Sequence, residues 1–131
     1  MTTGTIIVLN GTSSAGKTSI VGALQSILAE PYLHAGMDTF FHMLPQRYLD
    51  WPLWREVLGN NTHAGPVGRP LVMGMHQAVA ALARAGNHVL VDHVFVEPQW
   101  VADCADLFAP GLPDRRSLPA GGGIAARAAA L

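Results

Sequence analysis

Cysteine and charge are both scarce in this sequence. Its 131 residues include one cysteine, charged residues make up 13% of the chain, and the formal net charge is −1. A single cysteine excludes an intramolecular disulfide, and the charge balance excludes the strongly basic surface of a nucleic-acid-binding protein. No apolar run approaches the roughly 18 residues of a membrane-spanning helix, and the start lacks the basic and apolar regions of a signal peptide. We therefore expect a cytoplasmic protein with no nucleic-acid or membrane partner.

Hydrophobic patterning predicts alternating strands and helices. Unbroken apolar runs are typical of strands buried on both faces, whereas apolar residues at helical spacing indicate helices. Strands are expected at 5–9, 32–37 and 88–95, and helices at 17–29, 39–44, 51–57, 71–86 and 98–108. Residues 45–70 are otherwise read as an irregular loop, of a length that usually serves function. The order of elements predicts an α/β fold with a parallel sheet.

Lysine is as scarce as cysteine, and the only lysine of the chain lies in a phosphate-binding pattern. The segment from Gly11 to Thr18 matches G-x-x-x-x-G-K-[ST], between an expected strand and an expected helix. Its glycines allow backbone N–H groups to surround a phosphate, and the helix start adds its positive dipole end. Lys17 is expected to act on the β- and γ-phosphates of ATP as a catalytic residue. The nucleotide-binding residues are thus predicted as Gly11, Thr12, Ser13, Ser14, Ala15, Gly16, Lys17 and Thr18; the alternative is a glycine-rich turn that binds nothing.

Two oxygen-bearing side chains are candidates for holding Mg²⁺. The Thr18 hydroxyl follows the P-loop lysine, and Asp92 lies near the end of the strand expected at 88–95. In P-loop proteins an acid at the end of a neighbouring buried strand completes the metal site. The alternative for Asp92 is a carboxylate that only caps or solvates the strand end, and His93 is read as a strand-end histidine.

Asp38 follows the strand expected at 32–37, and two roles are open for it. Carboxyl ends of parallel strands gather at one edge of a sheet, so Asp38 could accept the proton of a hydroxyl that receives the phosphate. It could equally cap the helix expected at 39–44. An apolar cluster near Asp38 is read either as core or as a pocket for a partly apolar acceptor: Met37, Phe40, Phe41, Met43, Trp51 and Trp54.

The histidines and the cysteine give no sign of a metal site in the sequence. None of the six histidines has zinc-type spacing to Cys104. They are read as surface or core residues, and Cys104 as a buried, inert thiol.

An ordered series of motifs resembles chloramphenicol phosphotransferase-like proteins. The matching pieces, within residues 4–108, are 6–18, 24–28, 30–33, 36–38, 83–86 and 91–95. The resemblance implies a P-loop kinase fold that moves the γ-phosphate of ATP to a hydroxyl of the antibiotic. It also implies that Asp38 is the catalytic base and that residues 11–18 form the phosphate loop.

The chain departs from that family in two places. Asp92-His93 stands where the family usually has paired acids, and nothing after Pro110 resembles the family's further strand or its lid helix with arginines. The lid role is not carried to Arg115, Arg116 or Arg127. We therefore expect a three-layer P-loop NTPase, kinase-like and C-terminally incomplete, over residues 1–109. Residues 110–131 are expected to be a low-complexity, disordered tail, explained by truncation or a change of reading frame.

These observations predict an ATP- and Mg²⁺-dependent phosphotransferase acting on a hydroxyl of a small, chloramphenicol-like molecule. The alternative is a truncated P-loop module that binds ATP without catalysis. A GTPase switch is disfavoured, because its Asn-Lys-x-Asp signature needs a second lysine that the chain lacks.

Overall fold

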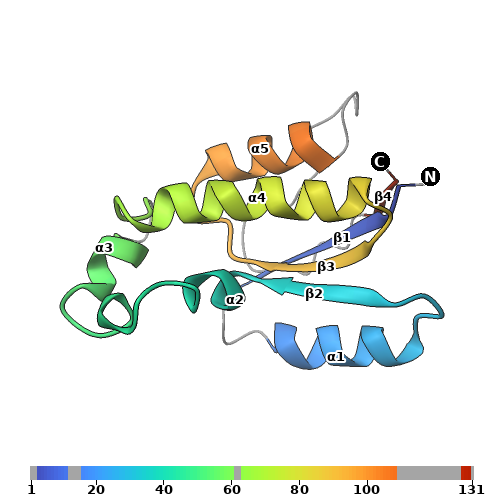
Figure 1. Ribbon diagram of the computed structural model, residues 1–131, viewed down its shortest axis with the longest axis horizontal. Helices are drawn as coiled ribbons and strands as arrows, with labels where there is room; N and C mark the ends of the chain where they lie inside the picture. The colour runs from blue at the N-terminus through green and yellow to red at the C-terminus, as the bar shows by residue number, and fades with distance from the viewer. Residues whose placement is uncertain (1–2, 12–15, 61–62, 109–127, 131) are drawn as a thin grey trace.

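The computed structural model describes residues 3–11, 16–60, 63–108 and 128–130 (Figure 1). Its elements follow the expected alternation of strands and helices. They are β1 (Thr5–Asn10), α1 (Lys17–Ile27), β2 (Tyr32–Gly36), α2 (Met37–Phe41), a 3-10 turn η2 (Gln46–Tyr48), α3 (Trp54–Leu58), α4 (Gly68–Arg84), β3 (His88–His93), α5 (Pro98–Phe108) and β4 (Ala128–Ala130).

The sheet has the strand order β2-β3-β1-β4. Strands β1, β2 and β3 are parallel, with Val89 of β3 opposite Ile6 on one side and Leu33 on the other. This confirms the expected α/β fold with a parallel sheet. The three-residue β4 runs antiparallel to β1, with Ala130 opposite Thr5.

Strand β4 lies in the segment expected to contain no strand, so that expectation is wrong for residues 128–130. A strand pairs through backbone groups, which alanine supplies as well as any residue, so the side-chain pattern carries no signal for it. Residues 109–127 lie outside the described part of the chain. The expected boundary near residue 110, the disordered tail and the three arginines at 115, 116 and 127 therefore remain predictions.

Helices cover both faces of the sheet and make three layers. Helix α1 packs on one face, and α4 and α5 pack side by side on the other (Figure 1). On the α1 face, Val21 packs with Leu9 and Leu90. On the other face a larger core joins the strands to α4 and α5; its buried members are Ile6, Val8, Ala35, Met75, Val79, Ala80, Ala83, Val89, Val91, Cys104 and Phe108. Successive residues of β3 therefore serve different layers, as expected for a strand buried on both faces.

The start of α2 excludes one of the two roles considered for Asp38. Gly36 ends β2 and is also the residue before the helix, with extended dihedrals (φ −100°, ψ 153°) and no side-chain cap. Asp38 lies inside the first turn of α2. The N-cap interpretation of Asp38 is therefore wrong, because the chain passes directly from strand to helix without an intervening capping residue.

Residues 45–70 contain more regular structure than the sequence indicates. They hold η2, α3 and the first residues of α4, which begins at Gly68 rather than at residue 71. Pro70 lies in the first turn of α4, where a missing backbone N–H costs no helical hydrogen bond. Across the described residues, no helix combines the length and the apolar character needed to cross a membrane.

Candidate functional site

Lys17 is the first residue of α1 and is almost completely buried. Its ammonium lies 2.7 Å from Asp92 Oδ1 and donates a hydrogen bond of 3.2 Å to the backbone carbonyl of His93. The same carbonyl accepts a hydrogen bond of 3.2 Å from the backbone N–H of Gly11. The end of β3 therefore holds both ends of the loop between β1 and α1.

The glycine before α1 has the conformation that the loop pattern requires. Gly16 has φ 74° and ψ 21°, in the left-handed region that favours glycine. Thr12, Ser13, Ser14 and Ala15 lie outside the described residues, so their role in phosphate binding stays a prediction.

Four of the site residues expected from the sequence line one small cavity. Lys17, Thr18, Asp38 and Asp92 surround a space of about 70 Å³, together with Met37 and Val94. They come from α1, α2 and β3, which meet at the carboxyl edge of the parallel strands. The cavity is lined by one ammonium, one hydroxyl and two carboxylates, a combination that suits a phosphate with its divalent cation.

His34 is a further neighbour of this cavity that the sequence reasoning missed. Its Nε2 lies 3.5 Å from Asp92 Oδ2. Gly36 of β2 lies opposite Asp92 of β3, and alternate residues of a strand share a face, so His34 points to the same side. Strand alternation combined with the register of the two strands would have found it.

A second, larger cavity adjoins the first and is mainly apolar. Its volume is about 550 Å³, and its lining includes Phe41, Val57, Trp54 and Trp100. The rings of Phe41 and Trp54 meet edge to face, with centroids 5.7 Å apart. Met37 and Asp38 line both cavities, which places the Asp38 side chain between the charged space and the apolar one.

The apolar cluster expected around Asp38 divides into three groups. Met37, Phe41 and Trp54 line the large cavity, whereas Met43 and Trp51 are 65% and 72% exposed and take no part in it. Phe40 packs against the core between the sheet and α4. Helical spacing alone could not separate these groups, because α2 is only one turn long.

One wall of the large cavity is held by a buried acid, Glu97. Its Oε2 accepts a hydrogen bond of 3.1 Å from the backbone N–H of Ala64, which lines the cavity. Its Oε1 pairs with the Arg69 guanidinium, also at 3.1 Å. Glu97 therefore fixes the segment before α4 against the start of α5.

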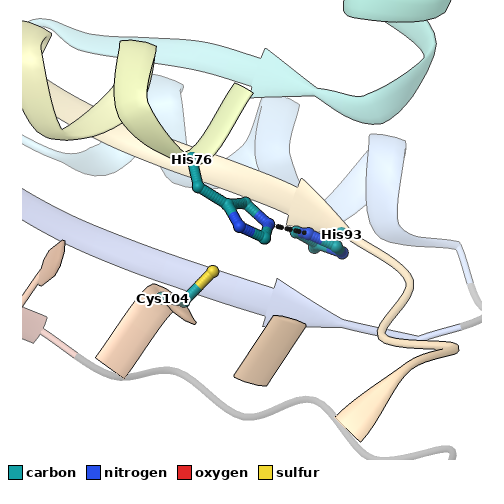
Figure 2. A group of neighbouring side chains, drawn as sticks. All are labelled: His76, His93 and Cys104. Carbon is teal, nitrogen blue, oxygen red and sulfur yellow. Dashed lines mark hydrogen bonds between the residues drawn. The ribbon is translucent and has the colours of Figure 1, made fainter. Parts of the chain in front are cut away.

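The other face of β3 carries a buried cluster that the sequence did not indicate (Figure 2). His76 of α4, His93 of β3 and Cys104 of α5 are buried, and their ligand atoms all lie within 4.8 Å of one another. His93 is in the core, in agreement with its reading as a strand-end histidine, and its ring stacks on Phe95 at 4.1 Å. The three residues are far apart in the chain, so no local spacing could have predicted their meeting.

Burial controls the charge state of this cluster. The pKa of His93 is lowered to about 3, mainly by burial and also by the nearby His76 and Lys17, against an opposing effect of the Val94 backbone. Burial also lowers the pKa of His76, although the hydrogen bond and charge of Asp103 oppose this. The pKa of the Cys104 thiol is raised, first by burial and then by Asp103. Both imidazoles are therefore neutral and the thiol is protonated near neutral pH.

A parallel sheet between helices, with a loop lysine paired to an acid on the neighbouring strand, defines an α/β protein of the P-loop kinase-like class. The sequence model of the family described as Chloramphenicol phosphotransferase-like protein matches residues 4–112. The chain belongs to this family.

Two curated relatives from Mycobacterium tuberculosis support this assignment. They are Putative O-phosphotransferase MT2714 of strain CDC 1551 / Oshkosh and Putative O-phosphotransferase Rv2636 of strain ATCC 25618 / H37Rv. Each is 33% identical to this chain over 121 residues, which cover 82% of this chain and 54% of the relative. The chain thus spans about half the length of the curated relatives it matches.

Proposed function

We propose that the protein transfers the γ-phosphate of ATP, in the presence of Mg²⁺, to a hydroxyl group of a small molecule. The observation that carries this proposal is the position of Asp38, which lines the charged cavity and the apolar cavity at once. A base for phosphoryl transfer has to reach the acceptor hydroxyl while that hydroxyl faces the phosphate.

The charged cavity supplies groups for the nucleotide side. Lys17 carries the ammonium that would interact with the β- and γ-phosphates, and Gly16 and Lys17 stand at the start of α1, where the helix dipole favours an anion. The Thr18 hydroxyl and the Asp92 carboxylate are hard oxygen ligands of the kind Mg²⁺ prefers. Bound Mg²⁺ would neutralise charge on the phosphates.

The transfer step then needs one base. The acceptor oxygen forms a bond to the γ-phosphorus as the bond from that phosphorus to the leaving ADP oxygen breaks. Asp38 takes the hydroxyl proton, while Lys17 compensates negative charge on the transferred group.

The apolar cavity supports an acceptor that is partly hydrophobic. Its volume of about 550 Å³ falls within the range of about 300–1,000 Å³ found for small-molecule sites. Aromatic walls from Phe41, Trp54 and Trp100 suit a flat or ring-containing molecule. A chloramphenicol-like compound, with a ring and free hydroxyls, is the acceptor that we propose to test first.

The test compares Asp38→Asn with Asp50→Asn, an exposed aspartate that lines neither cavity. ADP release and the mass of the phosphorylated product are measured with chloramphenicol and a panel of small alcohols, and Mg-ATP binding is measured by thermal shift. We expect Asp38→Asn to lose about 100-fold or more in kcat. Mg-ATP binding should stay close to the wild-type value, and Asp50→Asn should behave as wild type.

Three outcomes would count against this proposal. Equal loss of Mg-ATP binding and transfer in Asp38→Asn would remove the base assignment. Stabilisation of the wild-type chain by Mg-ATP without any phosphorylated product would identify a nucleotide-binding module instead. Absence of both binding and transfer would contradict any nucleotide role of this chain.

A further inference from the structure

The cluster of His76, His93 and Cys104 has no part in the phosphate transfer proposed above. It lies on the opposite face of β3 from Asp92, between the sheet and helices α4 and α5 (Figures 1 and 2). The exposed fractions of the two histidines are 0%, and that of Cys104 is 3%. Polar side chains this deeply buried usually have a complete set of partners.

Hydrogen bonding accounts for only part of this cluster. The Asp103 carboxylate can only accept, so His76 donates from Nδ1 to Asp103 Oδ2 over 2.6 Å. Neutral His76 then has a lone pair on Nε2, to which His93 donates from its own Nε2 over 2.7 Å. This leaves His93 Nδ1 buried and without a hydrogen-bond partner among the described residues. The hydrogen bonds among the described residues therefore leave the lone pair of His93 Nδ1 unused.

We propose that the ring nitrogens of His76 and His93 and the Cys104 sulfur form a Zn²⁺ site. Imidazole and thiolate are the ligands that zinc commonly takes, and three protein ligands leave a fourth position for water. Asp103 already accepts from the far side of the His76 ring, which is the contact that orients a metal-bound histidine and raises its basicity.

The geometry needs only small side-chain movements. Zn–N bonds of about 2.0 Å and Zn–S bonds of about 2.3 Å place two tetrahedral ligands roughly 3.3–3.8 Å apart. The facing nitrogens of the histidines, now 2.7 Å apart, would separate by about half an ångström. The donor atoms, which all lie within 4.8 Å of one another, would close by about 1.5 Å at most.

Zinc binding also gives a defined proton balance. The S–H bond of Cys104, the Nε2–H bond of His93 and the hydrogen bond between the imidazoles break, and two Zn–N bonds, one Zn–S bond and an N–H bond at His93 Nδ1 form. His93 keeps one proton, on the ring nitrogen that faces away from the metal, and the thiol proton passes to solvent. One proton is therefore released for each Zn²⁺ bound, and no oxidant or reductant is required.

Such a site would join α4, β3 and α5 through one ion. The side chain of His93 would bind the metal, and the backbone carbonyl of the same residue accepts hydrogen bonds from Gly11 and Lys17. The metal would therefore be fixed directly behind the proposed phosphate loop. This inference does not depend on the proposed phosphotransferase activity.

The test is a Co²⁺ titration of the full chain, reduced and stripped of metal with a chelator. We expect one equivalent of Co²⁺ to produce thiolate-to-cobalt charge-transfer absorption and the intense visible bands of tetrahedral cobalt. Zn²⁺ added to the metal-free chain should release one proton per chain in weakly buffered solution, and Zn²⁺ should displace bound Co²⁺ without further proton release, whereas Mg²⁺ should do neither. Co²⁺ bound by oxygen ligands near Thr18 and Asp92 would lack the charge-transfer band, so the two sites are distinguishable.

Two variants complete the test. Cys104→Ser should lose the charge-transfer band, and Asp103→Asn should bind about 10- to 100-fold more weakly. Asp106→Asn, an exposed position on the same helix, is the matched control and should bind as wild type. If the wild-type chain shows no charge-transfer band, or if the band persists in Cys104→Ser, the proposal is overturned whether or not the other variants fold.

Discussion

The Lys17 ammonium and the Asp92 carboxylate form an ion pair of 2.7 Å in which both side chains are nearly buried. Each group therefore neutralises the other where a phosphate and its cation are proposed to bind. An incoming phosphate offers Lys17 a new anion while its Mg²⁺ offers Asp92 a new cation. We infer that the two partners of this pair are exchanged together, so that neither buried charge is left uncompensated.

Breaking this pair should destabilise the protein. Among the described residues, Lys17→Met leaves the Asp92 carboxylate with His34 as its remaining ion-pair contact, and we expect a loss of about 3 kcal/mol in the free energy of unfolding. The double variant Lys17→Met/Asp92→Asn should lose less than the sum of the two single variants. Urea denaturation followed by tryptophan fluorescence measures this cycle, with exposed Arg84→Met as control. Additive effects would mean that the pair contributes no coupling energy.

The apolar cavity should control the acceptor and not the nucleotide. Removing one aromatic wall by Trp54→Ala should raise the KM for the acceptor about tenfold, which corresponds to about 1.4 kcal/mol. The KM for ATP should change little, because Trp54 does not line the charged cavity. Steady-state kinetics with each substrate varied in turn checks this. Trp51→Ala, at a position 72% exposed, is the control, and a similar effect there would contradict the assignment of the pocket.

Glu97 should hold the cavity wall at Ala64. In Glu97→Gln the amide oxygen can still accept from Ala64, but the amide NH2 then faces the Arg69 guanidinium, donor against donor. We expect a loss of about 1–3 kcal/mol in the free energy of unfolding. Hydrogen exchange at the Ala64 amide should become faster than in the wild type. Glu30→Gln, at an exposed position, should leave that exchange unchanged; an unchanged rate in Glu97→Gln would show that the wall is held by other contacts.

Two glycines should respond in opposite directions to the same substitution. Gly59 has φ 66°, and a Cβ there would lie 2.2 Å from the backbone oxygen of His63, so Gly59→Ala should cost about 2 kcal/mol or more. Gly74 lies within α4 with nothing within 4 Å of its Cβ position. Gly74→Ala should therefore stabilise the protein by about 0.5–1 kcal/mol. Thermal unfolding of the two variants checks both signs, and a stable Gly59→Ala would show that the turn can rearrange.

Local patterns predicted the elements that position the site. The apolar runs at 5–9 and 88–95 correspond to β1 and β3, and the helix expected at 98–108 is α5. These elements are predictable because the spacing of apolar residues along the chain depends on whether one face or both faces of an element are buried. The sequence also predicts that Lys17 and Asp92 belong to the same nucleotide site. Parallel topology brings their elements to one edge of the sheet, and this topology follows from the order of strands and helices.

Other features depend on contacts that no local pattern records. The sequence predicts that α4 begins at residue 71, whereas it begins at Gly68. Gly68 and Pro70 fall in the stretch read as an irregular loop, although a first helical turn tolerates both. The division of the aromatic cluster into cavity walls and exposed residues depends on how α2 and α3 pack. The meeting of His76, His93 and Cys104 needs the relative position of two helices and a strand, which spacing along the chain does not contain.

Adjacent residues of β3 serve two separate chemical environments. The carboxylate of Asp92 reaches Lys17 in the charged cavity, whereas the ring of His93 reaches His76 between the helices. A single residue inserted between Leu90 and Asp92 would turn an imidazole toward the phosphate loop and a carboxylate into the apolar interior. An insertion in this short strand would therefore disable both faces at once.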